Sequence, residues 1–188
     1  MTNLFRKITA RLRAKLTWIR WWIWLRRRVN GRIKLRGRLD RLEVEPSFRC
    51  DGDLWLGIYS ETGKIRIGRD VHASGPLVVT AINEVDIAND VLIGPNVMIT
   101  DHYHGDPHLP ETLDIPPSSR ALHTRGAIVI AEMVQIGANT SILSPARIGR
   151  SAIIGANSVV RGELAGRTIH AGVPARPVKK PQVSNQNP

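Results

Sequence analysis

The sequence contains a single cysteine, no acidic residue near its start and no long apolar run. The lone Cys50 excludes an intramolecular disulfide and fits a reducing compartment. Residues 1–30 hold nine basic residues and no acid, which leaves 18 basic against 16 acidic residues elsewhere. The apolar stretch at residues 18–25 is interrupted by Arg20 and is far shorter than the roughly 20 residues that span a bilayer. A chain of 188 residues has room for one domain with appendages.

The basic segment 1–30 also carries four of the five tryptophans, at positions 18, 21, 22 and 24. Its apolar residues recur at three- and four-residue intervals, as on one face of a helix: Leu4, Ile8, Leu12, Leu16, Ile19 and Ile23. Tryptophan and arginine favour the lipid headgroup layer, so the pattern predicts an N-terminal amphipathic α-helix on an anionic membrane surface. Two alternatives stay open: a helix packed on its own chain or on a partner subunit, and a nucleic-acid-binding arm. Nothing else in the chain resembles a nucleic-acid module, so we expect no nucleic-acid partner.

Isoleucine recurs at every sixth position in the second half of the chain. The series comprises Ile130, Ile136, Ile142, Ile148 and Ile154, and continues as Val160. Two earlier series, separated by a slip at residues 83–85, comprise Ile67, Ala73 and Val79, and then Ile87, Ile93 and Ile99. A period of six fits neither a helix nor an alternating strand. It fits one side of a coil that is built from a short strand and a tight corner.

Each expected corner begins with a small residue and has Asn, Asp or Ser two positions later. The six segments are 68–70, 88–90, 94–96, 137–139, 149–151 and 155–157. Asn and Asp tolerate the left-handed backbone conformation that a sharp corner requires. A small or apolar residue after the corner adds a second inward side chain: Val71, Val91, Val97, Val134, Thr140, Ala152 and Ser158. The sequence therefore predicts an all-β parallel β-helix over residues 31–165, with a β-sandwich as the alternative.

The repeat stops after Ile99 and resumes at Ile128, which defines an extended loop at about residues 100–127. Prolines 110, 116 and 117 argue against regular structure there. Four of the six histidines lie in or beside this loop, at positions 102, 104, 108 and 123. Long excursions from a regular scaffold are usually functional or disordered, and the histidines favour function. Residues 166–188 are expected to form a C-terminal segment that ends in a disordered tail.

Three features together resemble the hexapeptide-repeat acyltransferases. They are the Ile-Gly-x-Asn-like hexads, the histidine-bearing loop after Gly-Pro-Asn-Val at 94–97, and the closing Ala-Gly-Val-Pro-Ala-Arg at 171–176. Their order resembles that of galactoside and maltose acetyltransferases and of bacterial polysaccharide O-acetyltransferases, over roughly residues 60–180. The resemblance implies a left-handed β-helix that forms a homotrimer, with active sites between neighbouring subunits. It also implies acetyl-CoA as acyl donor, direct transfer without an acyl-enzyme, and no metal.

Within that resemblance the general base falls on His102. Imidazole titrates near neutral pH, so it can accept the proton of a sugar hydroxyl as the oxygen attacks the thioester. Asp101 and His104 are further catalytic candidates, to orient the imidazole or to hold the acceptor. Because adjacent residues in a strand point to opposite faces, a structural role for Asp101 stays open. The candidate acceptor contacts are Asn83, Glu84 and Tyr103.

The resemblance also implies a coenzyme A groove along the C-terminal coils. Carried over by position, its small contacts are Ala138 and Ala156, and its basic contacts are Arg176 and Lys179. Two positions depart from the family pattern near the nucleotide: Gln135 replaces a tryptophan, and residues 161–162 replace a Thr-Lys pair.

The combined expectation is an acetyl-CoA-dependent O-acetyltransferase for a sugar hydroxyl in bacterial surface polysaccharide or lipid-linked glycan synthesis. Such an enzyme is expected to be cytoplasmic and peripherally attached to the inner face of the cytoplasmic membrane. One alternative is a nucleotide-sugar N-acetyltransferase. A second is a zinc hydratase like the γ-class carbonic anhydrases, which needs three converging imidazoles; the His-x4-His pair of those enzymes does not occur among the loop histidines. A third is a non-catalytic scaffold for a membrane complex.

Overall fold

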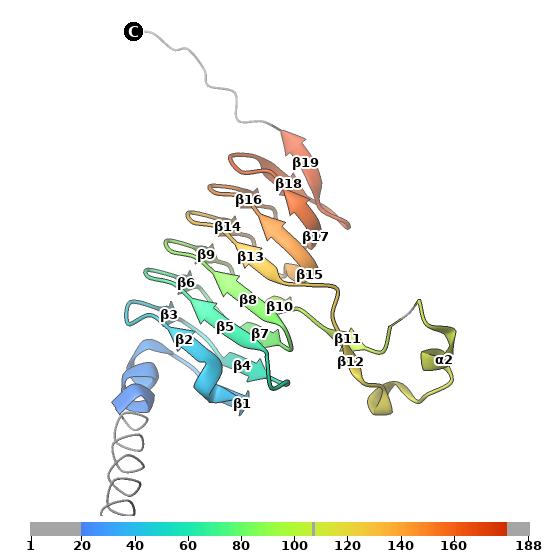
Figure 1. The fold of residues 1–188 in the computed structure, drawn as a ribbon. Coiled ribbons are helices and arrows are strands. Elements are labelled where there is room, and N and C mark those ends of the chain that lie inside the picture. The colour runs from blue at the N-terminus through green and yellow to red at the C-terminus, as the bar shows by residue number, and fades with distance from the viewer. Residues whose placement is uncertain (1–19, 107, 180–188) are drawn as a thin grey trace, which may run out of the picture.

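The computed structural model describes residues 20–106 and 108–179, and shows a left-handed parallel β-helix of about six turns (Figure 1). The coils stack from the N-terminal end to the C-terminal end, and one loop projects from the side. The sequence-based prediction for residues 1–19 and for the tail from residue 180 lies outside the described residues.

Each coil contributes one strand to each of three faces. The first face contains β1 (Ile33–Gly37), β4 (Leu54–Ile58), β7 (Leu77–Ala81) and β10 (Val97–Thr100). The second face contains β2 (Leu42–Val44), β5 (Lys64–Ile67), β8 (Glu84–Ile87) and β13 (Ile128–Ile130). Two longer strands, β15 (Ser141–Ile148) and β17 (Val159–Leu164), pass round the corner between these faces, so that both faces belong to one 10-stranded sheet.

The third face is made of two- and three-residue strands. They are β3 (Arg49–Cys50), β6 (His72–Ala73), β9 (Leu92–Ile93), β14 (Gln135–Ile136), β16 (Ile153–Ile154) and β18 (Ile169–Ala171). The chain then folds back as β19 (Arg176–Lys179), which pairs antiparallel with β18. The first coil also contains a short 3-10 helix, η1 (Leu39–Arg41).

The six-residue repeat forms the core, as predicted. Ile130, Ile136 and Ile142 fall on the second, third and first faces in turn, and Ile148, Ile154 and Val160 repeat that order one coil later. All six are at most 2% exposed. The second set of inward residues after the corners, Val71 to Ser158, is buried as well. Continuous apolar ladders therefore fill the interior and hold the coils together.

The corners also have the predicted backbone conformation. Asp70, Asp90, Asn96, Asn139, Ser151 and Asn157 all have φ between 56° and 59°. Coils approach one another closely here: a Cβ atom at Gly137 would lie only 2.4 Å from the backbone nitrogen of Ala156. Two further corners were not predicted, because Met133 and Arg167 take the same left-handed conformation without an Asn, Asp or Ser side chain.

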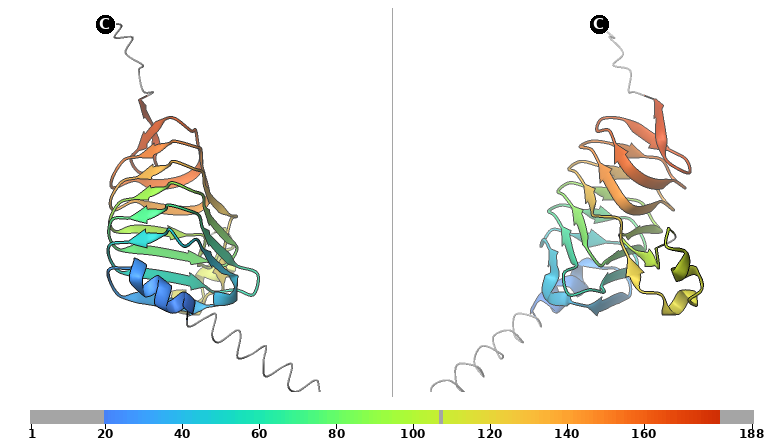
Figure 2. Two further views of the ribbon diagram at one scale, coloured as in Figure 1. Left: turned by 90° about the vertical axis from the view of Figure 1, so that its left-hand side faces the viewer. Right: turned by 45° about the vertical axis from the view of Figure 1, so that its right-hand side comes forward.

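Residues 20–28 are helical and lie across the N-terminal end of the β-helix (Figure 2). Leu25 is fully buried against the first coil and Val29 is 5% exposed. Trp24 Nε1 donates a hydrogen bond to the carbonyl of Pro46 at 3.2 Å. This part of the tail therefore covers the open end of the core, which supports the alternative of a helix packed on its own chain. Among residues 20–106 and 108–179, no helix has the length and hydropathy needed to cross a membrane.

Candidate active site

The predicted loop leaves the β-helix at the corner between the first and second faces, after β10 and before β13 (Figure 1). Its base is a two-stranded antiparallel ribbon of β11 (Tyr103–His104) and β12 (Leu122–His123). The rest contains α2 (Pro110–Leu113) and η2 (Pro117–Ser119). Arg120 donates hydrogen bonds to the carbonyls of Leu113 and Ile115, which ties the distal part of the loop to its base.

Asp101, the first residue of the loop, is completely buried. Its Oδ1 accepts a hydrogen bond from the backbone N–H of Ile82 at 2.8 Å. Its Oδ2 accepts from the backbone N–H groups of Asn83 and Glu84, at 2.7 and 2.8 Å. The slip in the repeat at residues 83–85 is thus the segment whose N–H groups surround this carboxylate. Three donors compensate for the loss of water around a buried charge.

The imidazole of His102 lies beside that carboxylate, with Nδ1 3.0 Å from Asp101 Oδ1. The ring is mostly buried, since 11% of its side chain is exposed. A carboxylate only accepts hydrogen bonds, so a neutral imidazole in this position carries its proton on Nδ1. The lone pair is then on Nε2, which is the arrangement that a general base requires.

His102 borders a cavity of about 430 Å³ on the first face, beneath the loop. Its lining is mainly apolar and comes from three coils and the loop ribbon: Trp55, Tyr59, Val78, Met98 and Leu122. Thr80 and Thr100 add hydroxyl groups, whose oxygens are 2.9 Å apart. Sequence reasoning missed Trp55 and Tyr59, although their alternation with Gly57 in one strand indicated that all three face outward.

Of the other predicted catalytic and acceptor residues, His104 lines this cavity, whereas Tyr103, Asn83 and Glu84 are not among its lining residues. His104 is exposed and lines the same cavity as His102. The hydroxyl of Tyr103 is buried and has no hydrogen-bond partner among the described residues. Asn83 and Glu84 approach Asp101 through the main chain, while the Glu84 carboxylate forms an ion pair with Lys64 at 2.8 Å.

The residues expected to bind coenzyme A lie elsewhere on the molecule. Ala138 and Ala156 stack on successive coils at the corner between the third and first faces, where Asn157 N donates to Ala138 O at 2.8 Å. Arg176 is exposed on β19, and the backbone of Lys179 belongs to the same strand. The first face thus separates the alanine corner from the His102 corner within one chain.

Among residues 20–106 and 108–179, neither a thiol nor a group of metal ligands accompanies the Asp101–His102 pair. Cys50 is buried on the third face, where burial raises the pKa of its thiol and Sγ lies 3.3 Å from Gly52 O. Within the part of the chain that the structure describes, no three His, Cys, Asp or Glu side chains are grouped as metal ligands.

Known proteins share the repeat and the fold of this chain. Residues 127–162 match the family model described as Bacterial transferase hexapeptide (six repeats). The putative lipopolysaccharide biosynthesis O-acetyl transferase WbbJ of Escherichia coli is 39% identical over 123 residues, which cover 63% of this chain and 61% of WbbJ. The chain is similar to the hexapeptide-repeat transferases over this repeat region. Galactoside O-acetyltransferase of E. coli is a more distant relative, 29% identical over 65% of this chain and 57% of that enzyme.

Solved structures of two acyl-transferring enzymes share the fold. The acetyltransferase VCA0836 from Vibrio cholerae, crystallised with acetyl-CoA, has a TM-score of 0.55 and 25% identity, over 84% of this chain and 74% of that one. The N-acyltransferase AntD from Bacillus cereus has a TM-score of 0.60 and 20% identity, over 82% and 84% of the two chains. The chain spans 61%, 64% and 53% of the length of three curated relatives that it matches.

Proposed function

We propose that this protein is an acetyl-CoA-dependent O-acetyltransferase that acts on a sugar hydroxyl, with His102 as general base. The observation that carries the proposal is the buried Asp101 carboxylate, 3.0 Å from His102 Nδ1, which leaves Nε2 as the proton acceptor. The similarity to WbbJ and to galactoside O-acetyltransferase supports both the acyl transfer and the oxygen acceptor.

The proposed reaction is a direct transfer. His102 Nε2 accepts the proton of the acceptor hydroxyl while the oxygen attacks the thioester carbonyl carbon, and Asp101 stabilises the imidazolium that forms. Collapse of the tetrahedral intermediate breaks the carbon–sulfur bond, and the imidazolium returns the proton to the departing thiolate. The products are the O-acetyl sugar and free coenzyme A. No acyl-enzyme is needed, because the single cysteine is buried on another face.

The chain offers a surface for the extended pantetheine arm of the donor. The stacked corner at Ala138 and Ala156 has short side chains and coils that touch through backbone atoms, so an extended chain can lie against it. Arg176 and Lys179 lie on β19, at the C-terminal end of the β-helix, and are our candidates to bind the phosphates of coenzyme A.

We place the complete site between subunits of a homotrimer. Within one chain the alanine corner and His102 lie on opposite edges of the first face. A neighbouring copy can bring its own alanine corner beside His102, so that a donor bound to one subunit reaches the base of the next. Closed symmetric assemblies of this kind repeat one contact between identical copies.

We also propose attachment to the anionic inner face of the cytoplasmic membrane through residues 1–30. The described part of that segment is seated on the β-helix by Leu25 and turns Arg20, Ile23 and Arg27 outward, with Ile23 48% exposed. A surface of exposed arginines around an apolar side chain fits an anionic lipid headgroup layer. A membrane location suits an acceptor in surface polysaccharide or lipid-linked glycan synthesis.

The test is incubation of the protein with acetyl-CoA and a panel of free sugars, nucleotide sugars and undecaprenyl-linked glycans. Release of coenzyme A is measured and the products are identified by mass spectrometry. His102→Ala is expected to lower kcat by about two to four orders of magnitude and to leave coenzyme A binding unchanged. The matched control is His72→Ala, which removes an imidazole on the third face whose Nε2 lies 2.6 Å from Asp51 Oδ2. Full activity of His102→Ala contradicts the role of His102 as general base. Acetylation of amino sugars alone, at nitrogen, contradicts the hydroxyl acceptor and identifies an N-acetyltransferase.

A further inference from the structure

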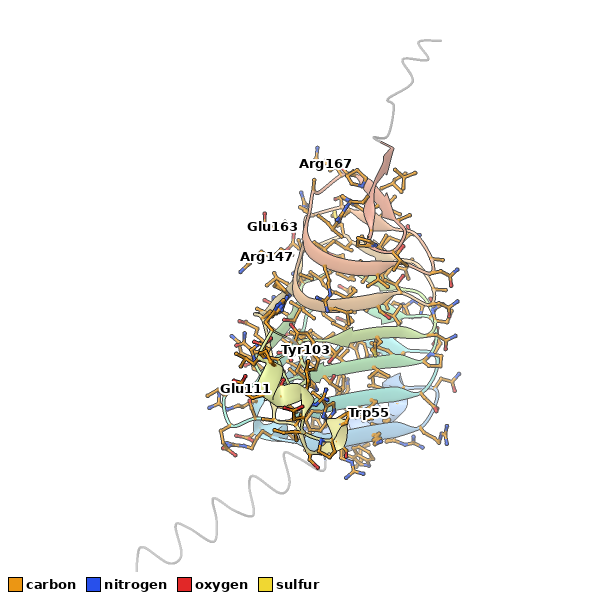
Figure 3. All side chains as sticks on the ribbon, turned by 90° about the vertical axis from the view of Figure 1, so that its right-hand side faces the viewer. Trp55, Tyr103, Glu111, Arg147, Glu163 and Arg167 are labelled. Carbon is orange, nitrogen blue, oxygen red and sulfur yellow. The ribbon has the colours of Figure 1, made fainter. Side chains whose placement is uncertain are left out.

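An aromatic pair at β4, Trp55 on the strand and Tyr59 directly after it, borders the His102 cavity. Trp55 and Gly57 lie on β4 and Tyr59 follows directly after it; the three alternate with the buried residues Leu54, Leu56 and Ile58 and so face outward from the core. In Figure 3 the side chain of Trp55 lies on the loop side of the molecule, nearer the N-terminal coils than Tyr103. Both rings line the cavity that contains His102.

Gly57 determines where the ring of Tyr59 lies. A Cβ atom at Gly57 would be 2.6 Å from Tyr59 Oη and 2.7 Å from Tyr59 Cζ. The tyrosine ring therefore folds back along the strand and occupies the space that a side chain at position 57 would fill. This placement turns the other side of the ring toward solvent, and Tyr59 is 39% exposed.

The pair is held in place before any ligand binds. Trp55 Nε1 donates a hydrogen bond to Tyr59 Oη at 3.2 Å. The ammonium group of Lys34 lies 3.6 Å from the centre of the Trp55 ring, a cation–π contact from the neighbouring strand. The Tyr59 and His102 rings meet edge to face, with centroids 5.7 Å apart and an angle of 81° between planes. The aromatic surface is thus fixed relative to the imidazole.

This arrangement has the chemistry of a sugar-binding subsite. A pyranose ring has an apolar face of C–H groups and a rim of hydroxyls. An exposed aromatic ring can cover the apolar face, while the hydroxyls of Thr80 and Thr100 and the imidazole meet the rim. A ring held on Tyr59 would therefore present a hydroxyl toward His102.

We propose that Trp55 and Tyr59 form the subsite that binds the acceptor sugar ring and orients its hydroxyl. This inference rests on the proposed acetyl transfer and adds to it the residues that recognise the acceptor. Gly57 contributes indirectly, because the absence of its side chain lets the tyrosine ring lie against the strand.

Two variants disturb the subsite in different ways. Trp55→Ala removes one ring. Gly57→Ala keeps every aromatic and polar group but displaces the tyrosine ring, at low cost to folding because the contacted atoms are the far end of one side chain. Leu92→Ala is the matched control, since Leu92 is 43% exposed on the third face, away from the cavity.

Binding is measured without donor, so that no turnover is needed. Saturation-transfer NMR with the methyl glycosides of glucose, galactose, N-acetylglucosamine and glucuronic acid is expected to show ring C–H contacts for the wild type and Leu92→Ala. The affinity for the bound glycoside should fall about tenfold or more in Trp55→Ala and Gly57→Ala. In the transfer assay, the acceptor KM should rise by a similar factor while the KM for acetyl-CoA stays unchanged.

The outcomes separate this inference from the proposed function. Sugar binding that needs both rings, without any acetyl transfer, leaves the subsite standing and overturns the proposed function. Acetyl transfer to a sugar with an unchanged acceptor KM in both variants supports the proposed function and overturns the subsite. No binding of any glycoside to the wild type also overturns the subsite. If light scattering shows that Trp55→Ala and Gly57→Ala dissociate the oligomer, the pair is a contact between copies and the inference is wrong.

Discussion

Replacing Asp101 by Asn tests how the carboxylate acts on His102. The substitution keeps the size of the side chain but exchanges one carboxylate oxygen for an NH2 group, which only donates. In the wild type, one oxygen faces His102 Nδ1 and the N–H of Ile82, and the other faces the N–H groups of Asn83 and Glu84. The amide oxygen of Asn can satisfy only one of these two sets.

The better orientation of the amide follows from the donors. If the NH2 group pointed toward residues 83 and 84, it would face two backbone N–H groups, which are always donors and cannot accept its hydrogen bond. If the NH2 group pointed toward His102, it would face one backbone N–H, that of Ile82, and the imidazole. The imidazole can move its proton to Nε2 and then accept the hydrogen bond at Nδ1. We therefore expect the amide oxygen to stay with residues 83 and 84, and the imidazole to adopt the tautomer that cannot act as a base.

Two consequences can be measured. The value of kcat should fall by about two to four orders of magnitude, because general-base catalysis is lost. The free energy of unfolding should fall by about 2–4 kcal/mol, since the N–H of Ile82 loses a charged acceptor and the remaining bonds become neutral. His102→Ala should match the loss in kcat with a smaller loss of stability, because it leaves all three backbone hydrogen bonds intact.

The assays are acetyl transfer and urea unfolding of both single variants and the double variant. If Asp101 acts through His102, the double variant should be no slower than His102→Ala alone. Activity of Asp101→Asn within about threefold of wild type would show that Asp101 does not act through His102, as would fully additive losses in the double variant.

Three further predictions concern the tail, the thiol and the stacking of coils. Arg20→Glu with Arg27→Glu should weaken flotation with anionic vesicles about tenfold or more and leave the fold unchanged; undiminished flotation would contradict the membrane proposal. Because burial raises the pKa of the Cys50 thiol, Ellman's reagent should label it only when the protein unfolds, and fast labelling of the native protein would contradict its placement. Gly137→Val should lower the melting temperature, because its side chain would meet the backbone of Ala156; an unchanged melting temperature would argue against the close stacking.

The sequence predicted the β-helix well because every coil repeats the same local environment. The buried positions of Ile130 to Val160 and the left-handed corners at Asp70 to Asn157 each follow from a pattern a few residues long. The left-handed corners at Met133 and Arg167 were not predicted, because neither residue is the Asn, Asp or Ser that marks the other corners. There the stacking of neighbouring coils imposes the turn without a favourable side chain.

The site was less predictable because its contacts come from different coils. The partners of Asp101 are backbone N–H groups of the preceding coil, which no side-chain motif reveals. Trp55 and Tyr59 reach His102 from two coils away, through the parallel register of β4, β7 and β10. The helix at residues 20–28 was predicted. Its packing on the first coil was one of two alternatives to the membrane-surface position that the sequence favoured.

The tautomer of His102 tests the proposed general base most directly. Long-range proton–nitrogen correlation NMR on protein with ¹⁵N-labelled histidine, assigned by comparison with His102→Ala, reports which ring nitrogen carries the proton when the imidazole is neutral. We expect a proton on Nδ1 and an unprotonated Nε2. A proton on Nε2 would leave no base facing the acceptor and would contradict the proposed general base.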